Sequence, residues 1–181
     1  MTIAVFNGSP RKNGNTSQLV DEFVRALSSE GGGAEVMTLF DKDIKGCMNC
    51  GVCQKKAVPG HCTIKDDMSA AFDLFLSSDT IVLASPIYMW QFTPCTLAFM
   101  NRLHCLVRGD SNEMAGKKLA FLITMGDELE VSEYSVGGLK DFCEYFGMEY
   151  VGGVAVPYAT KEEIASGICA EDISDLIEQI V

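Results

Sequence analysis

The sequence predicts an α/β fold in which a parallel β-sheet lies between two layers of helices. Short apolar and β-branched segments alternate along the chain with longer segments whose apolar residues recur at helical spacing. Two of the short segments, residues 80–84 and 118–124, follow the pattern of strands that are buried on both faces. Because parallel strands need crossovers of a dozen or more residues, we expect the helical segments to cover both faces of the sheet.

The first half of the chain begins with an expected strand at residues 2–6, which ends in the turn residues 7–10. A helix is expected over residues 16–27, where apolar side chains recur at helical spacing before a glycine stop at 31–33. A second strand is expected at residues 34–40, followed by a cysteine-rich loop at residues 46–63. The next helix, residues 66–77, has its apolar residues on one face.

The second half continues the alternation. Expected strands at residues 80–84, 118–124 and 149–156 are separated by expected helices at about 94–105 and at 139–146, and a helix at 170–180 closes the chain. Five strands suit the sheet order 2-1-3-4-5 of a flavodoxin-like three-layer sandwich. The chain has 181 residues, 48% of them hydrophobic, with no linker or repeat, so we expect a single domain over residues 1–181.

The charge balance excludes some classes of partner. Lys and Arg number 14 against 25 Asp and Glu, a net charge of -11, which disfavours binding to nucleic acid or to anionic membranes. The N-terminus lacks the features of a signal peptide, and the apolar stretch at residues 81–90 is too short to span a bilayer. We therefore expect a cytoplasmic protein whose cysteines remain reduced.

In such a sheet the ligand binds beyond the carboxyl ends of strands one and three. The loop after strand one, residues 8–17, is rich in glycine, amides and hydroxyls and leads directly into a helix. Its backbone amides and the side chains of Ser9, Asn15, Thr16 and Ser17 suit a single phosphate held without metal, since the lysine of a P-loop is missing. The alternative is a polar connection in which Asn15 or Thr16 caps the helix.

The loop after strand three, residues 85–92, contains the only Trp together with Tyr, Phe and Met. A flat, mostly apolar ring could pack there, although these side chains could instead merely cover the end of the sheet. The loop after strand four, residues 124–128, should border the same crevice, with Asp127 and Glu128 as solvated charges. A ligand with one phosphate and a planar, polar-edged ring matches flavin mononucleotide (FMN).

Four of the eight cysteines are concentrated in one short segment: Cys47, Cys50, Cys53 and Cys62. Consecutive two-residue gaps favour a [4Fe-4S] cluster over zinc, which usually takes two separated pairs. Residues 55–61 lengthen the last gap, so reduced or redox-active thiols without a cluster remain an alternative. The other four cysteines are expected to be small buried hydrophobes, and the two histidines to be structural: Cys95, Cys105, Cys143, Cys169, His61 and His104.

These motifs, together with residues 66–68 and 142–148, resemble the flavodoxin-like NADPH-dependent FMN reductase superfamily and, within it, the iron-sulfur flavoproteins. The resemblance implies that the phosphate is held by Ser9, Arg11, Asn15, Thr16 and Ser17. It implies that the isoalloxazine ring is bordered by Pro86, Ile87, Tyr88, Met89, Trp90, Thr124, Met125 and Gly126. The helix at residues 97–102 lacks the charged pair common in relatives, so no contact is carried over there, and Arg102 is interpreted as structural.

The leading hypothesis for function is an FMN-dependent oxidoreductase in which the flavin performs the chemistry and the protein binds and orients it. No acid, base or nucleophile of the protein stands out, so no catalytic residue is predicted. The electron donor would be NAD(P)H, or a ferredoxin-like protein if a cluster is present, and the acceptor a small molecule or a protein. The resemblance also implies a homo-oligomer, a dimer or tetramer. Two alternatives belong to other classes: a flavodoxin-type electron carrier without enzymatic activity, and a cysteine-based metal or redox sensor.

Overall fold

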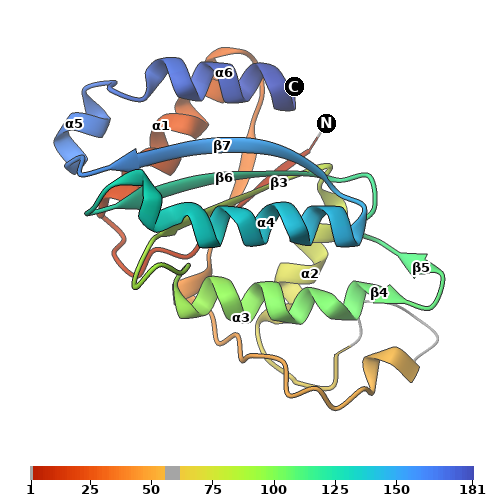
Figure 1. The fold of residues 1–181 in the computed structure, drawn as a ribbon. Coiled ribbons are helices and arrows are strands. Elements are labelled where there is room, and N and C mark those ends of the chain that lie inside the picture. The colour runs from red at the N-terminus through yellow and green to blue at the C-terminus, as the bar shows by residue number, and fades with distance from the viewer. Residues whose placement is uncertain (1, 56–61) are drawn as a thin grey trace.

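A computed structural model describes residues 2–55 and 62–181 of the chain. Its main sheet has five parallel strands in the order β2-β1-β3-β6-β7, which confirms the predicted flavodoxin-like sheet order (Figure 1). The strands are β1 (Ile3–Asn7), β2 (Ala34–Thr38), β3 (Thr80–Pro86), β6 (Lys118–Met125) and β7 (Glu149–Pro157). The lengthened cysteine gap at residues 56–61, and with it His61, lies outside the described residues.

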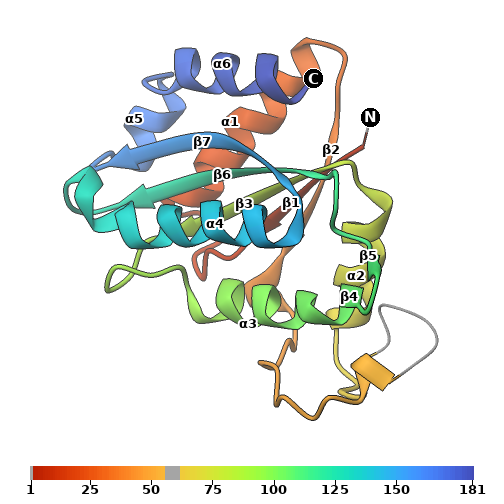
Figure 2. The same cartoon turned by 45° about the vertical axis from the view of Figure 1, so that its right-hand side comes forward.

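Helices cover both faces of the sheet, as Figures 1 and 2 show. One face carries α1 (Asn15–Ser29), α5 (Lys161–Ala165) and α6 (Ala170–Ile180), and the other carries α2 (Met68–Ser77), α3 (Pro94–Arg102) and α4 (Glu133–Phe146). Short 3-10 turns lie at Leu39–Asp41, Cys53–Lys55, Leu103–Leu106 and Leu129–Ser132. In the described part of the chain, no helix is both long and apolar enough to cross a membrane.

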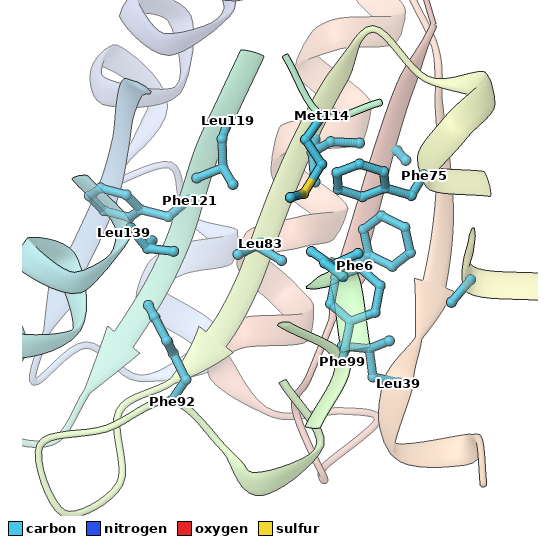
Figure 3. Close-up of a cluster of buried hydrophobic side chains, with 14 of the residues drawn as sticks. Phe6, Leu39, Phe75, Leu83, Phe92, Phe99, Met114, Leu119, Phe121 and Leu139 are labelled. Atoms are coloured by element: carbon cyan, nitrogen blue, oxygen red, sulfur yellow. The ribbon is translucent and has the colours of Figure 1, made fainter. Parts of the chain in front are cut away.

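The alternation of side chains along β1 divides the core into two layers. Ile3 and Val5 belong to the cluster under α1 and α6, whereas Ala4 and Phe6 belong to the cluster under α2, α3 and α4. In the second cluster the rings of Phe6 and Phe99 stack with centroids 4.3 Å apart (Figure 3). This contact fixes α3 against the first strand of the sheet.

Three local features differ from the prediction. Helix α4 begins at Glu133 rather than at residue 139, because packing supports a helix across Gly137 and Gly138 despite their low helix propensity. Helix α3 ends at Arg102, and a 3-10 turn takes the chain onward to Leu106. Helix α5 and the hairpin of β4 (Val107–Arg108) with β5 (Ser111–Asn112) were not expected, because such short elements show no periodicity.

The sheet register brings the loops after β1, β3 and β6 to one edge. Asn7 pairs with Ala84, and Pro86 pairs with Thr124, so these three strands end side by side. The cysteine segment lies elsewhere, below α3 in Figure 1, near the carboxyl end of that helix. The chain therefore has two separate regions in which chemistry-bearing residues gather.

Candidate functional site

A cleft of two joined cavities opens at the carboxyl ends of β1, β3 and β6. One cavity has a volume of about 310 Å³ and the other about 450 Å³, and they share part of their lining. Volumes of this order are typical of cofactor sites. The shared lining consists of Ile87, Tyr88, Met125 and Gly126. Arg11, Asn15, Pro86 and Thr124 line the smaller cavity, and Met89 and Trp90 line the larger.

Helix α1 begins at the smaller cavity without a side-chain cap. Its N-cap residue is Gly14, and the first backbone amide bonded within the helix is that of Gln18, which donates to the Gly14 carbonyl. The amides of the first turn, residues 15–17, therefore precede the hydrogen-bonded ladder. The alternative that Asn15 or Thr16 caps this helix is wrong, because both side chains bond elsewhere. Asn15 Nδ2 donates to the Ala159 carbonyl at 2.6 Å, and the Thr16 hydroxyl contacts that of Thr124.

The hydroxyls predicted to bind phosphate make hydrogen bonds to other groups of the protein. Ser9, Thr16 and Ser17 are buried, and none of them lines either cavity. Ser9 Oγ and Ser17 Oγ both donate to the Arg11 carbonyl, at 3.1 and 3.0 Å. The buried side chain of Asn7, which sequence reasoning missed, accepts from the Ser9 amide and donates to Ser17 Oγ. These groups shape the loop and leave its outer edge to backbone amides and Arg11.

The larger cavity is bordered by a tight turn with an unusual backbone. Met89 and Trp90 have φ values of 50° and 63°, and Tyr88 and Gln91 pair across the turn by two backbone hydrogen bonds. Two consecutive positive φ angles are typical of a type I′ turn, in which Asn-Gly is preferred. Ser135 at the start of α4 donates to the Trp90 carbonyl at 3.0 Å. Strain of this kind is typical of functional loops.

The end of β7 contributes cleft residues that sequence reasoning missed. Tyr158 and Ala159 line the smaller cavity, and Val131 lines the larger one. The Tyr158 amide donates to the Met125 carbonyl at 2.8 Å, and its hydroxyl donates to Asp127 Oδ1 at 3.3 Å. The position of Tyr158 directly after a strand was the available signal. Asp127 and Glu128 are exposed, as predicted, and Asp127 also lines the larger cavity.

All four cysteines of the motif line one small pocket beside the end of α3. Its volume is about 60 Å³, and its wall includes Cys47, Cys50, Cys53, Cys62, Arg102, His104 and Cys105. Gln54 fastens this segment to the fold by donating to the carbonyls of His104 and Val107, at 3.2 and 3.0 Å. Gln54 thus anchors the cysteine segment against the residues that follow α3, which include Cys105 of the same pocket.

Polar hydrogens already point at two of these sulfurs. The Asn49 amide donates to Cys47 Sγ at 3.4 Å, and Cys50 Sγ lies 3.6 Å from Thr63 Oγ1. The Val52 amide and then Thr63 lower the pKa of the Cys50 thiol, because their hydrogen bonds favour the thiolate. Thiolates are the form in which cysteines bind metals.

The remaining cysteines differ from one another. Cys143 and Cys169 are buried among apolar residues, as expected, and burial raises the pKa of Cys143 to about 11. Cys95 is only partly buried and its thiol donates to the Gly8 carbonyl at 3.3 Å. Cys105 is buried as predicted, but it also faces the cysteine pocket, where burial and then the thiols of Cys53 and Cys62 raise its pKa.

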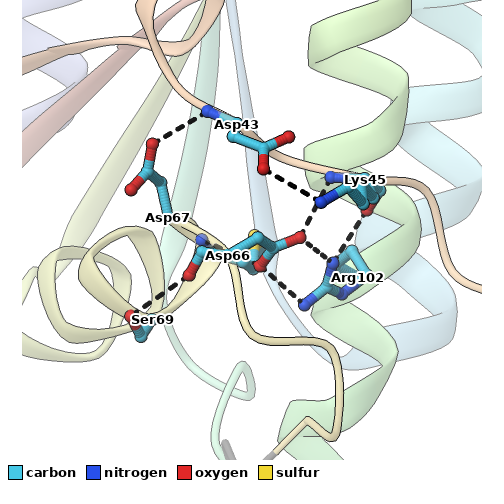
Figure 4. A network of polar contacts seen from close by, with 7 residues as sticks. Asp43, Lys45, Asp66, Asp67, Ser69 and Arg102 are labelled. Atoms are coloured by element: carbon cyan, nitrogen blue, oxygen red, sulfur yellow. Dashed lines mark hydrogen bonds and ion pairs between the residues drawn. The ribbon is translucent and has the colours of Figure 1, made fainter.

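A buried ion pair closes the base of the cysteine segment (Figure 4). Arg102 donates to both carboxylate oxygens of Asp66, at 2.7 and 3.2 Å, and to the Lys45 carbonyl at 2.8 Å. Asp66 in turn accepts from the Lys45 amide at 3.0 Å. Burial alone would raise the pKa of Asp66, but Arg102 and the amides of Lys45 and Met68 outweigh it, so that pKa lies below its usual value.

These donor sets fit the two predicted cofactors. The free amides of α1 and Arg11 suit the phosphate of FMN, and the aromatic turn suits its ring. For the cysteines, residues 2–55 and 62–181 contain no three His, Cys, Asp or Glu side chains grouped as ligands of one metal ion. A [4Fe-4S] cubane instead takes one thiolate at each iron, which matches four thiols spread around a pocket.

A doubly wound parallel sheet, with a cleft that joins a free helix N-terminus to an aromatic turn, defines a flavodoxin-like α/β protein. Residues 1–162 match the NADPH-dependent FMN reductase family, and the chain belongs to that family. This membership confirms the resemblance drawn from the motifs, and FMN is the cofactor of the class.

The chain is similar to proteins named iron-sulfur flavoprotein. One from Archaeoglobus fulgidus is 36% identical over 136 residues, which cover 74% of this chain and 60% of the relative. Another, from Methanosarcina thermophila, is 24% identical over an alignment of 193 positions, gaps included, which covers 99% of this chain and 98% of the relative. The chain thus spans less than two thirds of the A. fulgidus relative.

Among solved structures, the chain resembles an FMN-dependent NADH-azoreductase from Bacillus anthracis in complex with FMN. The TM-score is 0.71, with 14% sequence identity, and the whole length of both chains is covered. A likeness at this identity shows the shared fold.

Proposed function

We propose that this protein is an FMN-dependent oxidoreductase that takes electrons from NAD(P)H and passes them to a small-molecule or protein acceptor. The observation that carries the proposal is the continuous cleft between the uncapped start of α1 and the strained turn at Met89 and Trp90. FMN, when bound, supplies the hydride and electron transfer.

The residues of the chain would then bind and orient. The uncapped first turn of α1, which reaches the smaller cavity at Asn15, and the side chain of Arg11 would hold the phosphate at one end of the cleft. Tyr88, Met89 and Trp90 pack against the ring on one side, and Thr124, Met125 and Gly126 border it on the other. Ser9, Thr16 and Ser17 act from behind the loop by fixing its shape. Met89 is 82% exposed, so solvent reaches this part of the cleft wall.

The phosphate site is tested with two neighbouring cations of the same loop. Arg11 lines the cleft, whereas Lys12 faces away and pairs with Asp41 at 3.0 Å. Arg11→Gln should weaken FMN binding about 10-fold, as expected for the loss of one charged hydrogen bond, and should leave riboflavin binding unchanged. Lys12→Gln is the matched control. Equal losses for FMN and riboflavin would mean that Arg11 does not contact the phosphate.

Steady-state oxidation of NADH or NADPH with a quinone or free flavin separates the enzyme from a pure electron carrier. A carrier would show almost no turnover. A colourless protein that fails to bind added FMN would favour the sensor alternative.

We infer that Cys47, Cys50, Cys53 and Cys62 hold a [4Fe-4S] cluster that exchanges single electrons with a ferredoxin-like partner. The pocket, the amide hydrogens directed at sulfur and the names of the relatives support this inference. Anaerobically purified protein should contain iron and sulfide, and Cys50→Ser should lower both. Cys143→Ser, in the core, is the control. Iron content that is unaffected by Cys50→Ser would contradict the inference.

We also propose that the protein works as a homo-oligomer, a dimer or tetramer, in the cytoplasm. Exposed apolar side chains in the turn after β3 and in the segment that leads into α4 support an assembly: Met89, Trp90, Leu129 and Tyr134. None of the eight cysteines, all of which lie in the described part of the chain, forms a disulfide, which suits a reducing compartment. Light scattering during gel filtration should give a mass of two or four chains, and a monomer would contradict the proposal.

A further inference from the structure

Arg102 joins the two ends of the cysteine segment. Its Nη1 donates to the carbonyl of Lys45, which lies two residues before Cys47, and also to Asp66, which lies four residues after Cys62. Asp43 and Asp67 add a second link, because the Asp43 amide donates to Asp67 Oδ2 at 2.8 Å (Figure 4). The loop that bears the four thiols is therefore closed at its base by one guanidinium and its neighbours.

One nitrogen of the guanidinium, Nε, takes no part in the ion pair. Arg102 is 1% exposed, and its Nε has no hydrogen-bond partner in the described part of the chain. A buried N–H without a partner is costly and rare in native proteins. Because Arg102 also lines the cysteine pocket, a group bound there is a candidate to accept this hydrogen bond.

The negative charge expected in the pocket also favours a hydrogen bond from Arg102 Nε to a group bound there. Four thiolates would place negative charge in a pocket whose wall contains a buried cation. Arg102 shares the wall of this pocket with Cys62 and Cys105. Hydrogen bonds to sulfur and nearby positive charge are among the factors that set the reduction potential of iron-sulfur clusters.

We propose that Arg102 is a positioning residue of the cysteine site: its Nη groups hold the two ends of the segment, and its Nε–H donates to a sulfur of the cluster. This inference rests on the cluster proposed above. The N–H and the positive charge stabilise the more negative, reduced form, so Arg102 raises the reduction potential of the cluster. Asp66 acts in the opposite direction by offsetting the charge of Arg102.

Two substitutions with opposite expected shifts test the proposal. Arg102→Lys keeps a cation beside Asp66 but removes the Nε–H that donates to the cluster, so the reduction potential of the cluster should fall. Asp66→Asn leaves Arg102 in place without its counter-charge, and the potential should rise. Arg25→Gln, which breaks an exposed pair on α1 with Glu22, is the control and should leave the potential unchanged. The readout is a redox titration followed by electron paramagnetic resonance, with iron and sulfide content measured on each sample.

The outcomes separate this proposal from the one on which it rests. A wild-type protein without iron and sulfide after anaerobic reconstitution would overturn the cluster and the role of Arg102 together, while its flavin content would show whether the FMN site stands. A wild-type cluster whose potential is unchanged in Arg102→Lys would overturn the role of Arg102 alone. Should Arg102→Lys not fold, Asp66→Asn decides: an unchanged or lowered potential contradicts the proposal.

Discussion

Thr16 Oγ1 lies 2.7 Å from Thr124 Oγ1, and both side chains are buried. This hydrogen bond joins the first turn of α1 to the end of β6, so it fixes two of the segments that border the smaller cavity against each other. The two residues are separated by 108 positions in the chain.

Thr124→Val should lower the free energy of unfolding by about 1–3 kcal/mol, because it leaves the Thr16 hydroxyl buried without a partner. The double variant with Thr16→Val should recover most of this loss, since both polar groups are then gone. Thr80→Val is the control: Thr80 Oγ1 is buried without a partner in the described part of the chain, so that variant should be neutral or stabilising. Denaturant unfolding is measured for the wild type, both single variants, the double variant and Thr80→Val, and additive losses in the double variant would argue against the contact.

The strained turn makes a second prediction. Trp90→Gly should stabilise the FMN-free protein by about 1 kcal/mol, because glycine adopts a positive φ without steric cost. The same variant should bind FMN more weakly, since the indole that lines the cleft is lost. Met89→Gly relieves the same kind of strain at the neighbouring position and serves as the comparison. Melting curves and flavin titrations give the two readouts, and a destabilised Trp90→Gly protein would mean that the indole contributes more than the strain removes.

Stability should depend on pH through the Asp66–Arg102 pair. The pKa of Asp66 is lowered in the folded protein, so its contribution is fully present above the unfolded pKa of about 3.9 and is lost as pH falls through the folded value. Asp66→Asn should cost about 3–5 kcal/mol at neutral pH, because it leaves a buried guanidinium without its counter-ion. The wild-type and variant unfolding free energies should converge below about pH 4. A difference that stays constant down to pH 3 would show that the ion pair does not titrate in this range.

Two glycines should respond to alanine in opposite directions. A Cβ at Gly153 of β7 would lie 2.0 Å from the Phe121 carbonyl of β6, next to a bulge in the pairing of these strands. Gly153→Ala should therefore destabilise the protein by about 3 kcal/mol or more, since backbone must move. A Cβ at Gly138 within α4 meets nothing within 4 Å, so Gly138→Ala should stabilise by about 0.5–1 kcal/mol. Thermal unfolding of both variants checks the pair, and similar effects at the two sites would contradict the strand register.

Local sequence patterns were enough to predict the order and type of the main elements. Apolar periodicity is a local property, and it predicted α6 at Ala170–Ile180 and all five strands of the main sheet, each to within a few residues. The rule that ligands bind beyond the carboxyl ends of the strands also predicted that the three loops of the cleft lie together. The short elements α5 and the β4–β5 hairpin were not predicted, because they are too short to show apolar periodicity.

The contacts that the predicted side chains make depend on how the elements pack in three dimensions. The Thr16 hydroxyl bonds to Thr124, Tyr158 joins the cleft, and Cys105 joins the thiol pocket, because strand register and helix packing determine which distant segments meet. Arg102 could be interpreted as structural from its helix alone, but its pairing with Asp66 and its place beside the four cysteines depend on α3 lying across both ends of the cysteine segment. Contacts over such separations are specified by the packed core as a whole and by no local pattern of residues.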